Sequence, residues 1–240
     1  MNIQQNMFNQ PIGFPVAGWR PPPPPPHTPL DGRYCRVEPL AAALHAPTLY
    51  AANAVDSGRM WTYLGYGPFD GYGSYKEWVE SVENSHDPLF YALVEQSSGQ
   101  ASGVAAYLRL DRNNGAIEVG HIAYAPRLRH TPAATEAMYL LMEQAFALGY
   151  RRYEWKCDAL NAPSRAAAQR LGFSYEGLFR QAVVYKGRNR DTAWYAMTDQ
   201  DWPAIRAAFQ QWLDPNNFDE QGQQRVALSI LTGPLLVARG

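Results

Sequence analysis

The chain has 240 residues, 46% hydrophobic and 18% charged, and a chain of this length can bury a sizeable core without disulfides. Its 21 basic and 22 acidic residues give a formal net charge of −1, which argues against nucleic-acid binding through bulk attraction to phosphates. Two cysteines are too few for a disulfide framework or a zinc motif and favour a reducing compartment. Because the sequence has neither a run of about 18 apolar residues nor a secretory signal pattern, we expect a cytoplasmic protein without a membrane partner or a metal site.

Residues 1–30 form a proline-rich N-terminal segment, in which six prolines are consecutive, from Pro21 to Pro26. Proline fixes φ and lacks an amide donor, so this run is expected to adopt the polyproline II conformation. Three interpretations stay open. The segment is a disordered or semi-rigid tail, a ligand for a proline-recognition domain, or an ordered path over the domain anchored by Phe8, Phe14 and Trp19.

The first elements of the folded region are a strand over residues 34–37 and an Ala/Leu-rich helix over 40–55. The glycine- and aromatic-rich segment 61–75 is typical of a loop that forms a ligand wall or packs at the surface. Ser74 is expected to cap a short helix that ends near Asn84.

Three strands follow, over residues 89–95, 103–110 and 116–124, each rich in apolar or aromatic side chains. The sequences Ser98-Gly99 and Asn113-Asn114-Gly115 between them are typical of hairpin turns. The three strands should therefore be antiparallel neighbours.

The second half of the chain alternates helices and strands. Apolar residues at spacings of three and four predict a helix that begins at Pro132, with Thr131 as its N-cap, and ends before Gly149. Later elements are a strand over 153–157, a helix capped by Asn161, strands over 173–186 and 192–197, a helix over 202–213, and a C-terminal extension over 214–240. The extension ends in apolar residues, which must pack on this chain or on a partner subunit.

This order predicts one α/β domain over residues 31–213, with a mixed sheet of six or seven strands and flanking helices. The passage from 116 to 158 should be a right-handed crossover between parallel strands. Ligands of such sheets collect at the carboxyl ends of strands. Here the strand over 116–124 leads into a helix N-terminus beside Arg127, Arg129 and His130, which indicates an anion site.

Two motifs resemble those of the GNAT superfamily of acetyl-CoA-dependent N-acetyltransferases, and especially the branch that acetylates N-terminal amines of ribosomal proteins. Residues 122–137 (IAYAPRLRHTPAATEA) are similar to the acetyl-CoA signature Gln/Arg-x-x-Gly-x-Gly/Ala, but His130 and Pro132 stand where the branch has glycines. Residues 161–164 (NAPS) and 170–177 (RLGFSYEG) are similar to Asn-x-x-Ser and Leu-Gly-Phe-x-x-x-Gly. The resemblance covers about residues 31–202.

The resemblance implies splayed central strands and direct transfer of an acetyl group from acetyl-CoA to a primary amine. It also implies that acetyl-CoA contacts the end of one strand and the starts of two helices, at Ile122, Ala123, Tyr124, Arg129, His130, Thr131, Ala133, Ala134, Thr135, Asn161 and Ser164. Because Pro132 has no amide and His130 places a side chain beside the phosphates, CoA binding is either weakened or supported by an arginine or histidine contact.

Three residues are candidates for proton transfer. Glu118, a carboxylate in an apolar strand, could take a proton from the amine or could only form an ion pair. The resemblance places Ser164 near the CoA sulfur as donor to the leaving thiolate, with Tyr175 as second choice; their structural alternatives are a helix cap and a strand-surface aromatic. His121 lies three residues after Glu118 and should face the opposite side of the strand. Cys157 lacks a well-placed histidine for a covalent acetyl-cysteine route.

The resemblance thus favours an N-acetyltransferase whose acceptor is a protein N-terminus or a small-molecule amine. The segment 61–75 and the final hairpin would form the acceptor pocket, and a backbone amide of the strand over 116–124 would stabilise the tetrahedral intermediate. The alternative is a catalytically degenerate CoA-binding module that acts as an interaction protein, with the proline-rich tail recruiting a partner. The apolar C-terminal end and the N-terminal aromatics lead us to expect a homodimer.

Overall fold

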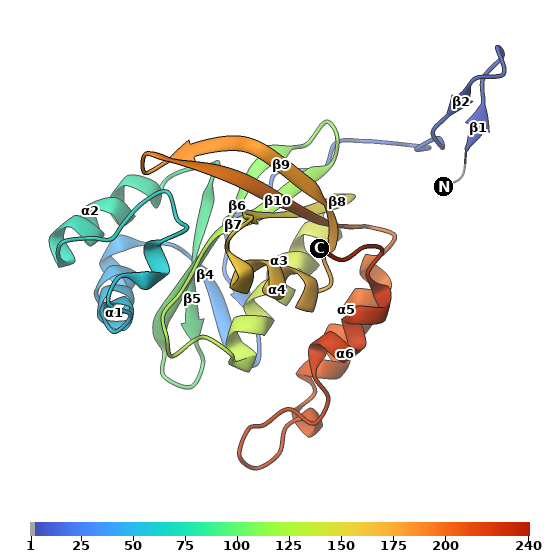
Figure 1. Cartoon of the computed structure of the whole chain (residues 1–240). Helices are drawn as coiled ribbons and strands as arrows, with labels where there is room; N and C mark the ends of the chain where they lie inside the picture. The colour runs from blue at the N-terminus through green and yellow to red at the C-terminus, as the bar shows by residue number, and fades with distance from the viewer. Residues whose placement is uncertain (1–2) are drawn as a thin grey trace.

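The computed structural model describes residues 3–240 and is built around one eight-stranded mixed sheet (Figure 1). The strand order is β3-β4-β5-β6-β7-β8-β10-β9. The strands are β3 (Leu30–Asp31), β4 (Cys35–Pro39), β5 (Leu89–Glu95), β6 (Gln100–Asp111), β7 (Ala116–Tyr124), β8 (Arg152–Asp158), β9 (Ser174–Tyr185) and β10 (Arg188–Thr198). The predicted mixed α/β class is confirmed, although the sheet has eight strands rather than six or seven because residues 30–31 pair with β4.

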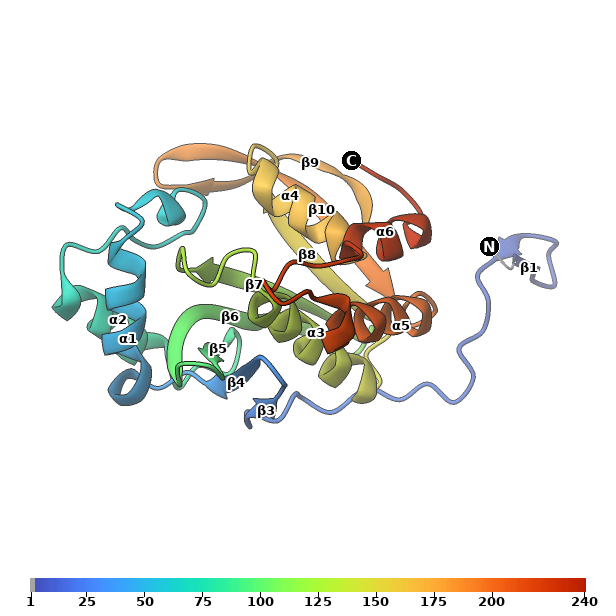
Figure 2. The ribbon, with the colours of Figure 1, turned by 90° about the horizontal axis from the view of Figure 1, so that it is seen from below.

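Helices cover both faces of the sheet (Figure 2). They are α1 (Ala42–Ala54), α2 (Tyr72–Val82), α3 (Pro132–Ala147), α4 (Ala162–Arg170), α5 (Trp202–Leu213) and the short α6 (Leu228–Thr232). One hydrophobic cluster packs α3, α4 and α5 on the first face, which we call the α3 face. A second cluster packs α1 and α2 on the other face, the α1 face. None of the described helices combines the length and apolar character needed to cross a bilayer.

The predicted hairpins β5–β6 and β6–β7 are antiparallel, and β7 and β8 are the predicted parallel pair. Side-chain caps at Thr131 and Asn161 are confirmed at the starts of α3 and α4. The prediction for Ser74 is wrong: α2 begins at Tyr72, so Ser74 lies inside its first turn, and Ser74 Oγ accepts from Gly71 N over 3.3 Å.

Strands β7 and β8 diverge at the centre of the sheet. Their ladder has four rungs, from Ala116–Arg152 to Val119–Trp155, although both strands continue beyond it. Past the last rung, residues 120–124 and 156–158 have no ladder partner in each other. The sheet is therefore open at its centre, on the carboxyl side of both strands.

A bulge changes the direction of the side chains in β7 at this point. Opposite β6, Gly120 pairs with Ala106 and Ala123 with Val104, so β7 carries one extra residue, and His121 adopts a φ of 51°. The prediction that His121 faces away from Glu118 is wrong, because strict alternation fails across a bulge. His121 packs against Phe90 on the α1 face, which is also the face of Glu118.

The proline-rich segment follows the third interpretation, an ordered path over the domain. Pro22 and Pro25 are buried while the prolines between and beside them are exposed, as expected for a polyproline II helix with three residues per turn. Arg112 Nε donates to Pro22 O over 2.7 Å, and Trp19 Nε1 donates to Asn113 O over 3.1 Å. Phe8 and Phe14 do not anchor it, since both are exposed.

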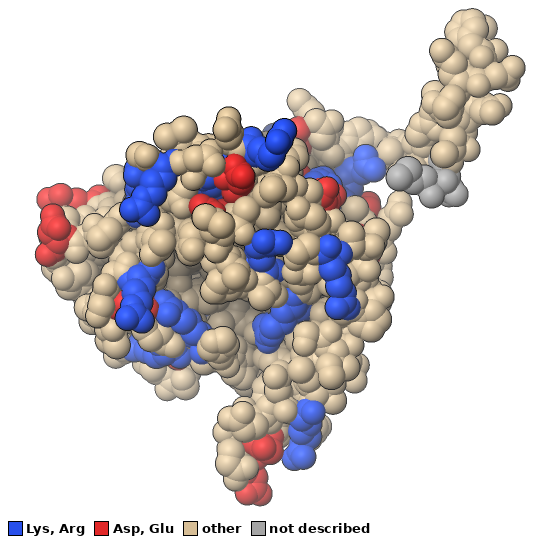
Figure 3. All heavy atoms as spheres, in the orientation of Figure 1, with Lys and Arg blue, Asp and Glu red and all other residues tan. Residues whose placement is uncertain are grey.

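Residues 3–18, which we call the N-terminal arm, project from the domain as a small hairpin, with β1 (Gln4–Gln5) paired to β2 (Pro11–Ile12) (Figure 1). Figure 3 shows no Lys, Arg, Asp or Glu on this arm. At the other end of the chain, the C-terminal extension packs on its own domain: Leu228 is fully buried, and Thr232 Oγ1 donates to Arg170 O over 2.9 Å.

Candidate functional site

The turn between β7 and α3 presents backbone amides at a helix N-terminus. Thr131 Oγ1 accepts from Ala134 N over 3.2 Å and so caps the helix. The amides of Arg129, His130 and Thr131 have no hydrogen-bond acceptor in the part of the chain that the structure describes. N–H groups in this position are suited to binding phosphate oxygens.

The two departures from the glycine pattern fit this turn. His130 has a φ of 62°, so it adopts the left-handed conformation that glycine favours, and its side chain is exposed. Pro132 occupies the first turn of α3, where a missing amide removes no intrahelical hydrogen bond. The backbone of the turn is therefore compatible with the pyrophosphate of acetyl-CoA.

The arginines of the turn already have partners within the chain. Arg129 Nη1 lies 2.9 Å from Asp56 Oδ1, and its Nε donates to Tyr124 O over 3.0 Å. Arg127 Nε lies 3.0 Å from Glu95 Oε1. A phosphate would have to share or displace these contacts, so the free amides are the stronger part of the candidate anion site.

Other members of the predicted cofactor set are mostly interior residues. Ile122 packs with the α3 face and Ala123 with the α1 face, so the end of β7 lies between the two layers. Tyr124 Oη donates to Ala134 O over 3.4 Å. Thr135 is buried and accepts from Arg170 Nη2 over 3.1 Å. Ala133 and Ala134 are buried as well, which leaves backbone contacts as their main route to a cofactor.

The start of α4 brings Asn161 and Ser164 to the last rung of the β7–β8 ladder. Asn161 Oδ1 accepts from Ser164 N over 3.2 Å. Ser164 Oγ accepts from the indole Nε1 of Trp155 over 3.0 Å, and Trp155 is in that last rung. Because the indole occupies one lone pair of Ser164 Oγ, the hydroxyl proton can be directed at another acceptor. Cys157 lies nearby on the α3 face, where burial raises the pKa of its thiol.

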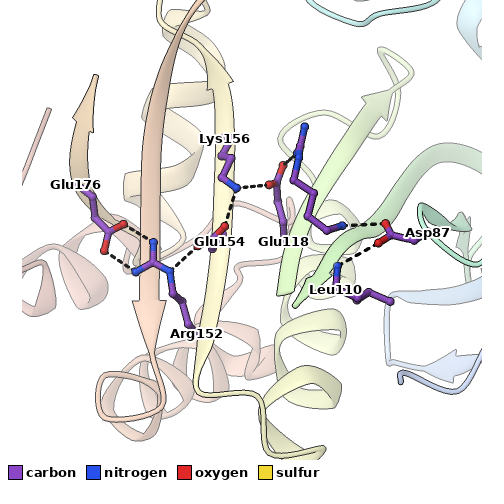
Figure 4. Close-up of polar contacts among 8 residues, drawn as sticks. Asp87, Leu110, Glu118, Arg152, Glu154, Lys156 and Glu176 are labelled. Atoms are coloured by element: carbon purple, nitrogen blue, oxygen red, sulfur yellow. Dashed lines mark hydrogen bonds and ion pairs between the residues drawn. The ribbon is translucent and has the colours of Figure 1, made fainter. Parts of the chain in front are cut away.

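Glu118 is at the centre of a chain of charged side chains that crosses the sheet (Figure 4). Its neighbours Ile117 and Val119 belong to the α3 face, so Glu118 points to the α1 face, where it is 2% exposed. Glu118 Oε2 lies 2.8 Å from Lys156 Nζ, and Oε1 accepts from Arg109 Nη1 over 2.6 Å.

The same chain continues across β8. Lys156 Nζ also lies 2.7 Å from Glu154 Oε2, and Arg152 bridges Glu154 to Glu176 on β9 (Figure 4). Burial raises the pKa of Glu118, and the contact with Lys156 and the charge of Arg109 reduce that rise without cancelling it. Burial acts in the same direction on Glu154, but the ion pair with Lys156 and the hydrogen bond from Arg152 outweigh it and lower its pKa.

His121 lies in an aromatic cluster beside this chain. Its ring stacks on Tyr66 at 5.7 Å and contacts Phe90 at 4.9 Å. Burial, with a smaller contribution from the charge of Arg109, lowers the pKa of His121 to about 4. The imidazole is therefore neutral at physiological pH.

Tyr175, the second candidate acid, lies beside the C-terminus. The centre of its ring lies 5.4 Å from that of Tyr195. The same ring packs against Gly240 so closely that an added Cβ at Gly240 would clash with it. Tyr175 N donates to Ala238 O over 3.1 Å. Tyr195 is closer to Ser164 by register, because it lies opposite Trp155 and accepts from Arg165 Nε over 3.2 Å.

The tip of the β9–β10 hairpin reaches the glycine- and aromatic-rich segment. Lys186 Nζ donates to Trp61 O over 2.7 Å and to Tyr66 O over 3.2 Å. Tyr63 Oη in turn donates to Leu160 O, just after β8, over 3.2 Å. These contacts join the two segments that sequence analysis assigned to the acceptor pocket.

Glu118, Asn161, Ser164 and the amide turn lie around the point where β7 and β8 diverge. Ser164, Asn161 and the amide turn lie towards the α3 face, whereas Glu118 lies on the α1 face, one rung before the strands diverge. Sequence analysis missed Lys156 and Arg109 as partners of Glu118, and Trp155 as the partner of Ser164. The alternation of Glu154 and Lys156 with buried aromatics in β8 was a signal for the first of these.

Comparisons with known proteins agree with this geometry. Residues 36–174 match the family model described as an acetyltransferase (GNAT) domain. A GCN5-related N-acetyltransferase from Brucella melitensis is 45% identical, with a TM-score of 0.89, over 91% of this chain and 100% of that one. A probable GNAT acetyltransferase from Chromobacterium violaceum is 41% identical, with a TM-score of 0.76, over 81% of this chain and 98% of that one. An uncharacterized N-acetyltransferase p20 from Bacillus licheniformis is 23% identical over 58% of this chain and 80% of its own length.

More distant structures share the fold alone. They include a putative ribosomal-protein-serine acetyltransferase from Vibrio cholerae, 17% identical with a TM-score of 0.62, over 72% of this chain and 99% of that one. They also include the microcin C7 self-immunity acetyltransferase MccE in complex with acetyl-CoA and AMP, 19% identical with a TM-score of 0.62, over 70% of this chain and 93% of that one. From the family match, the near-complete coverage of the Brucella relative and the open β7–β8 centre, the chain belongs to the GNAT family of acetyltransferases.

Proposed function

We propose that this protein transfers an acetyl group from acetyl-CoA directly to a primary amine, which is either a protein N-terminus or a small-molecule amine. The observation that carries the proposal is the buried carboxylate of Glu118 one rung before β7 and β8 diverge. Acetyl-CoA would enter from the α3 face, with the amine on the α1 face. The protein shares its fold with the putative ribosomal-protein-serine acetyltransferase from Vibrio cholerae, and we therefore include the N-termini of ribosomal proteins among the candidate acceptors.

The residues present would hold acetyl-CoA at its pyrophosphate and at its thioester. The free amides of Arg129, His130 and Thr131 would bind the pyrophosphate, and the helix dipole of α3 would favour its charge. Ser164 would lie near the thioester sulfur, with Asn161 beside it. The acetyl-CoA bound to the MccE fold relative is consistent with this choice of donor.

Each chemical step then has a residue of this chain to move its proton. Glu118 accepts the proton of the acceptor ammonium, directly or through water, because only the neutral amine attacks the acetyl carbon. A backbone amide of β7 stabilises the oxyanion of the tetrahedral intermediate. Ser164, oriented by the Trp155 indole, donates its hydroxyl proton to the leaving thiolate and regains a proton from the nitrogen that becomes the amide, directly or through water. Tyr175 is the alternative donor.

The acceptor would bind on the α1 face between the segment 61–75 and the β9–β10 hairpin, which Lys186 joins. His121, neutral at physiological pH, adds no positive charge that would repel an ammonium group there. The aromatic rings of Tyr66 and Trp78, stacked at 4.5 Å, would form an apolar wall of the acceptor site.

Calorimetry with CoA and an acetylation assay with a panel of peptides and small amines test the proposal. We expect Glu118→Gln to lower turnover by about 10²–10⁴-fold at unchanged CoA affinity. Glu176→Gln, at the exposed end of the same charged chain, is the matched control and should stay close to wild type. CoA binding without turnover on any amine would instead support the degenerate binding module.

We also propose a homodimer and a cytoplasmic location. The support for a dimer is exposed apolar surface on the N-terminal arm and on the edge strand β9, at Ile3, Met7, Phe8, Ile12, Phe14, Leu178, Phe179 and Val184. Two free, buried cysteines are consistent with a reducing compartment. Light scattering of the full chain and of a chain lacking residues 3–18 tests the dimer; two monomers of equal stability would exclude it.

A further inference from the structure

We propose that Lys156 is the positioning residue that keeps Glu118 ionised and aimed at the acceptor amine. The inference rests on the proposed function, in which Glu118 is the base. It concerns a residue that lies in β8, beyond the last rung of the β7–β8 ladder, and that no motif of the sequence marks.

Lys156 is held in one place by three contacts. Its Nζ lies 2.8 Å from Glu118 Oε2 and 2.7 Å from Glu154 Oε2. The same nitrogen lies 3.8 Å from the centre of the Trp194 ring, which gives a cation–π contact. The side chain is only 9% exposed, so water screens these interactions little.

Without this cation, two carboxylates would face each other across the sheet. Glu118 and Glu154 are direct partners in the ladder, and their side chains are 3% and 12% exposed. Like charges this close oppose each other's ionisation, and an opposite charge between them restores it. Lys156 therefore allows both carboxylates to be negatively charged in a site where burial alone would favour protonated Glu118.

The other charged groups around Glu118 do not replace Lys156. Arg109 contacts Oε1 over 2.6 Å, but its side chain is 59% exposed and thus screened by solvent. His121 on β7 is neutral above about pH 4. Asp87 accepts from the backbone amides of Arg109 and Leu110, which fixes the position of Arg109 and adds a negative charge (Figure 4). Arg152 lies on the far side of Glu154.

The proton balance of the cycle explains why this matters. Glu118 takes a proton from the ammonium nitrogen, and that proton must leave to solvent before the next turnover. A carboxylate with a higher pKa would hold its proton over a wider pH range, so fewer molecules would have a working base at a given pH.

The test is the pH profile of kcat/KM for one amine at saturating acetyl-CoA. In Lys156→Met we expect the acidic limb to move to higher pH by about 1–3 units. At a fixed pH on the acidic side of both profiles, this shift lowers kcat/KM by about tenfold to a thousandfold relative to the wild type. Lys156→Arg keeps the charge and should restore the limb. Glu154→Gln removes the competing carboxylate and should move the limb to lower pH.

A merely structural role gives a different result, namely an equal loss at every pH in Lys156→Met with no shift of the limb, and this would overturn the inference. If Lys156→Met does not fold, Glu154→Gln decides, since an unchanged or raised limb contradicts the electrostatic argument. Glu118→Gln distinguishes a failure of the proposed base from a failure of the role proposed for Lys156. A fully active Glu118→Gln enzyme refutes the base itself, whereas an inactive one with an unshifted Lys156→Met profile refutes only the role of Lys156.

Discussion

Glu136→Gln should destabilise the protein strongly, although Glu136 is outside the candidate chemistry. The carboxylate is buried in α3 and accepts three backbone N–H groups from the start of the first long strand, from Arg33, Tyr34 and Cys35 over 2.8, 2.6 and 2.9 Å. It thereby joins α3, which follows the candidate phosphate turn, to β4, which lies three strands from β7 in the sheet. Oε2 alone accepts from Tyr34 N and Cys35 N.

In the glutamine variant the side-chain amide can turn so that its one oxygen accepts from Tyr34 N and Cys35 N, and its NH₂ group then faces Arg33 N. One charge-assisted hydrogen bond of about 1.5–3 kcal/mol is lost, and the other two lose the negative charge of their acceptor. Allowing for relaxation of the neighbouring turn, we expect the free energy of unfolding to fall by about 3 kcal/mol. Urea denaturation followed by tryptophan fluorescence measures this as a lower midpoint at an unchanged m-value.

Glu143→Gln is the matched control, because it makes the same substitution in the same helix. Glu143 pairs with Arg206, and their side chains are 33% and 45% exposed, so its loss should cost less than about 1 kcal/mol. If the two variants lost the same stability, or if Glu136→Gln lost less than Glu143→Gln, the three amide contacts would not hold β4 to α3 as described.

Three further outcomes follow from contacts described above. Arg129→Glu should weaken CoA binding by about 1.5–3 kcal/mol in calorimetry, because it places a negative charge beside Asp56 at the phosphate turn; unchanged binding would refute the placement of the pyrophosphate. Because the pKa of His121 falls from 6.5 to about 4 on folding, the unfolded state takes up the proton first, and stability should decline as pH falls from 6.5 to 4. His121→Phe should flatten that decline in denaturation midpoints, and an unaltered slope would assign it to other groups. Leu228→Ala should cost about 2–5 kcal/mol in thermal or urea unfolding, since Leu228 is fully buried, and a neutral result would show that the C-terminal extension is not part of the core.

Local sequence signals were sufficient for most elements of the fold. The strands over 89–95 and 116–124 and the helix over 202–213 have the bounds that their composition predicts, because each is a continuous apolar or amphipathic run between turn residues. The caps at Thr131 and Asn161 were predictable for the same reason, since a cap depends on residues three positions away.

Contacts between distant segments were beyond these signals. The bulge at His121 depends on pairing with β6, and strict alternation assigns its side chain to the wrong face. The partners of the site residues come from other elements: Asp56 for Arg129, Lys156 for Glu118 and Trp155 for Ser164. The roles of Glu118, Ser164 and Tyr175 stay predictions, and the geometry adds reasons to test them in that order.

The docking point of Trp19 determines where anything attached to the N-terminus would lie. Its indole lies against Gly115, just before β7, where an added Cβ would clash with the ring. The candidate phosphate turn follows the other end of β7, nine residues away, or about 30 Å at the usual rise per residue. A fusion partner, fluorophore or surface linkage placed before residue 19 would therefore be remote from the candidate phosphate turn and would leave it accessible.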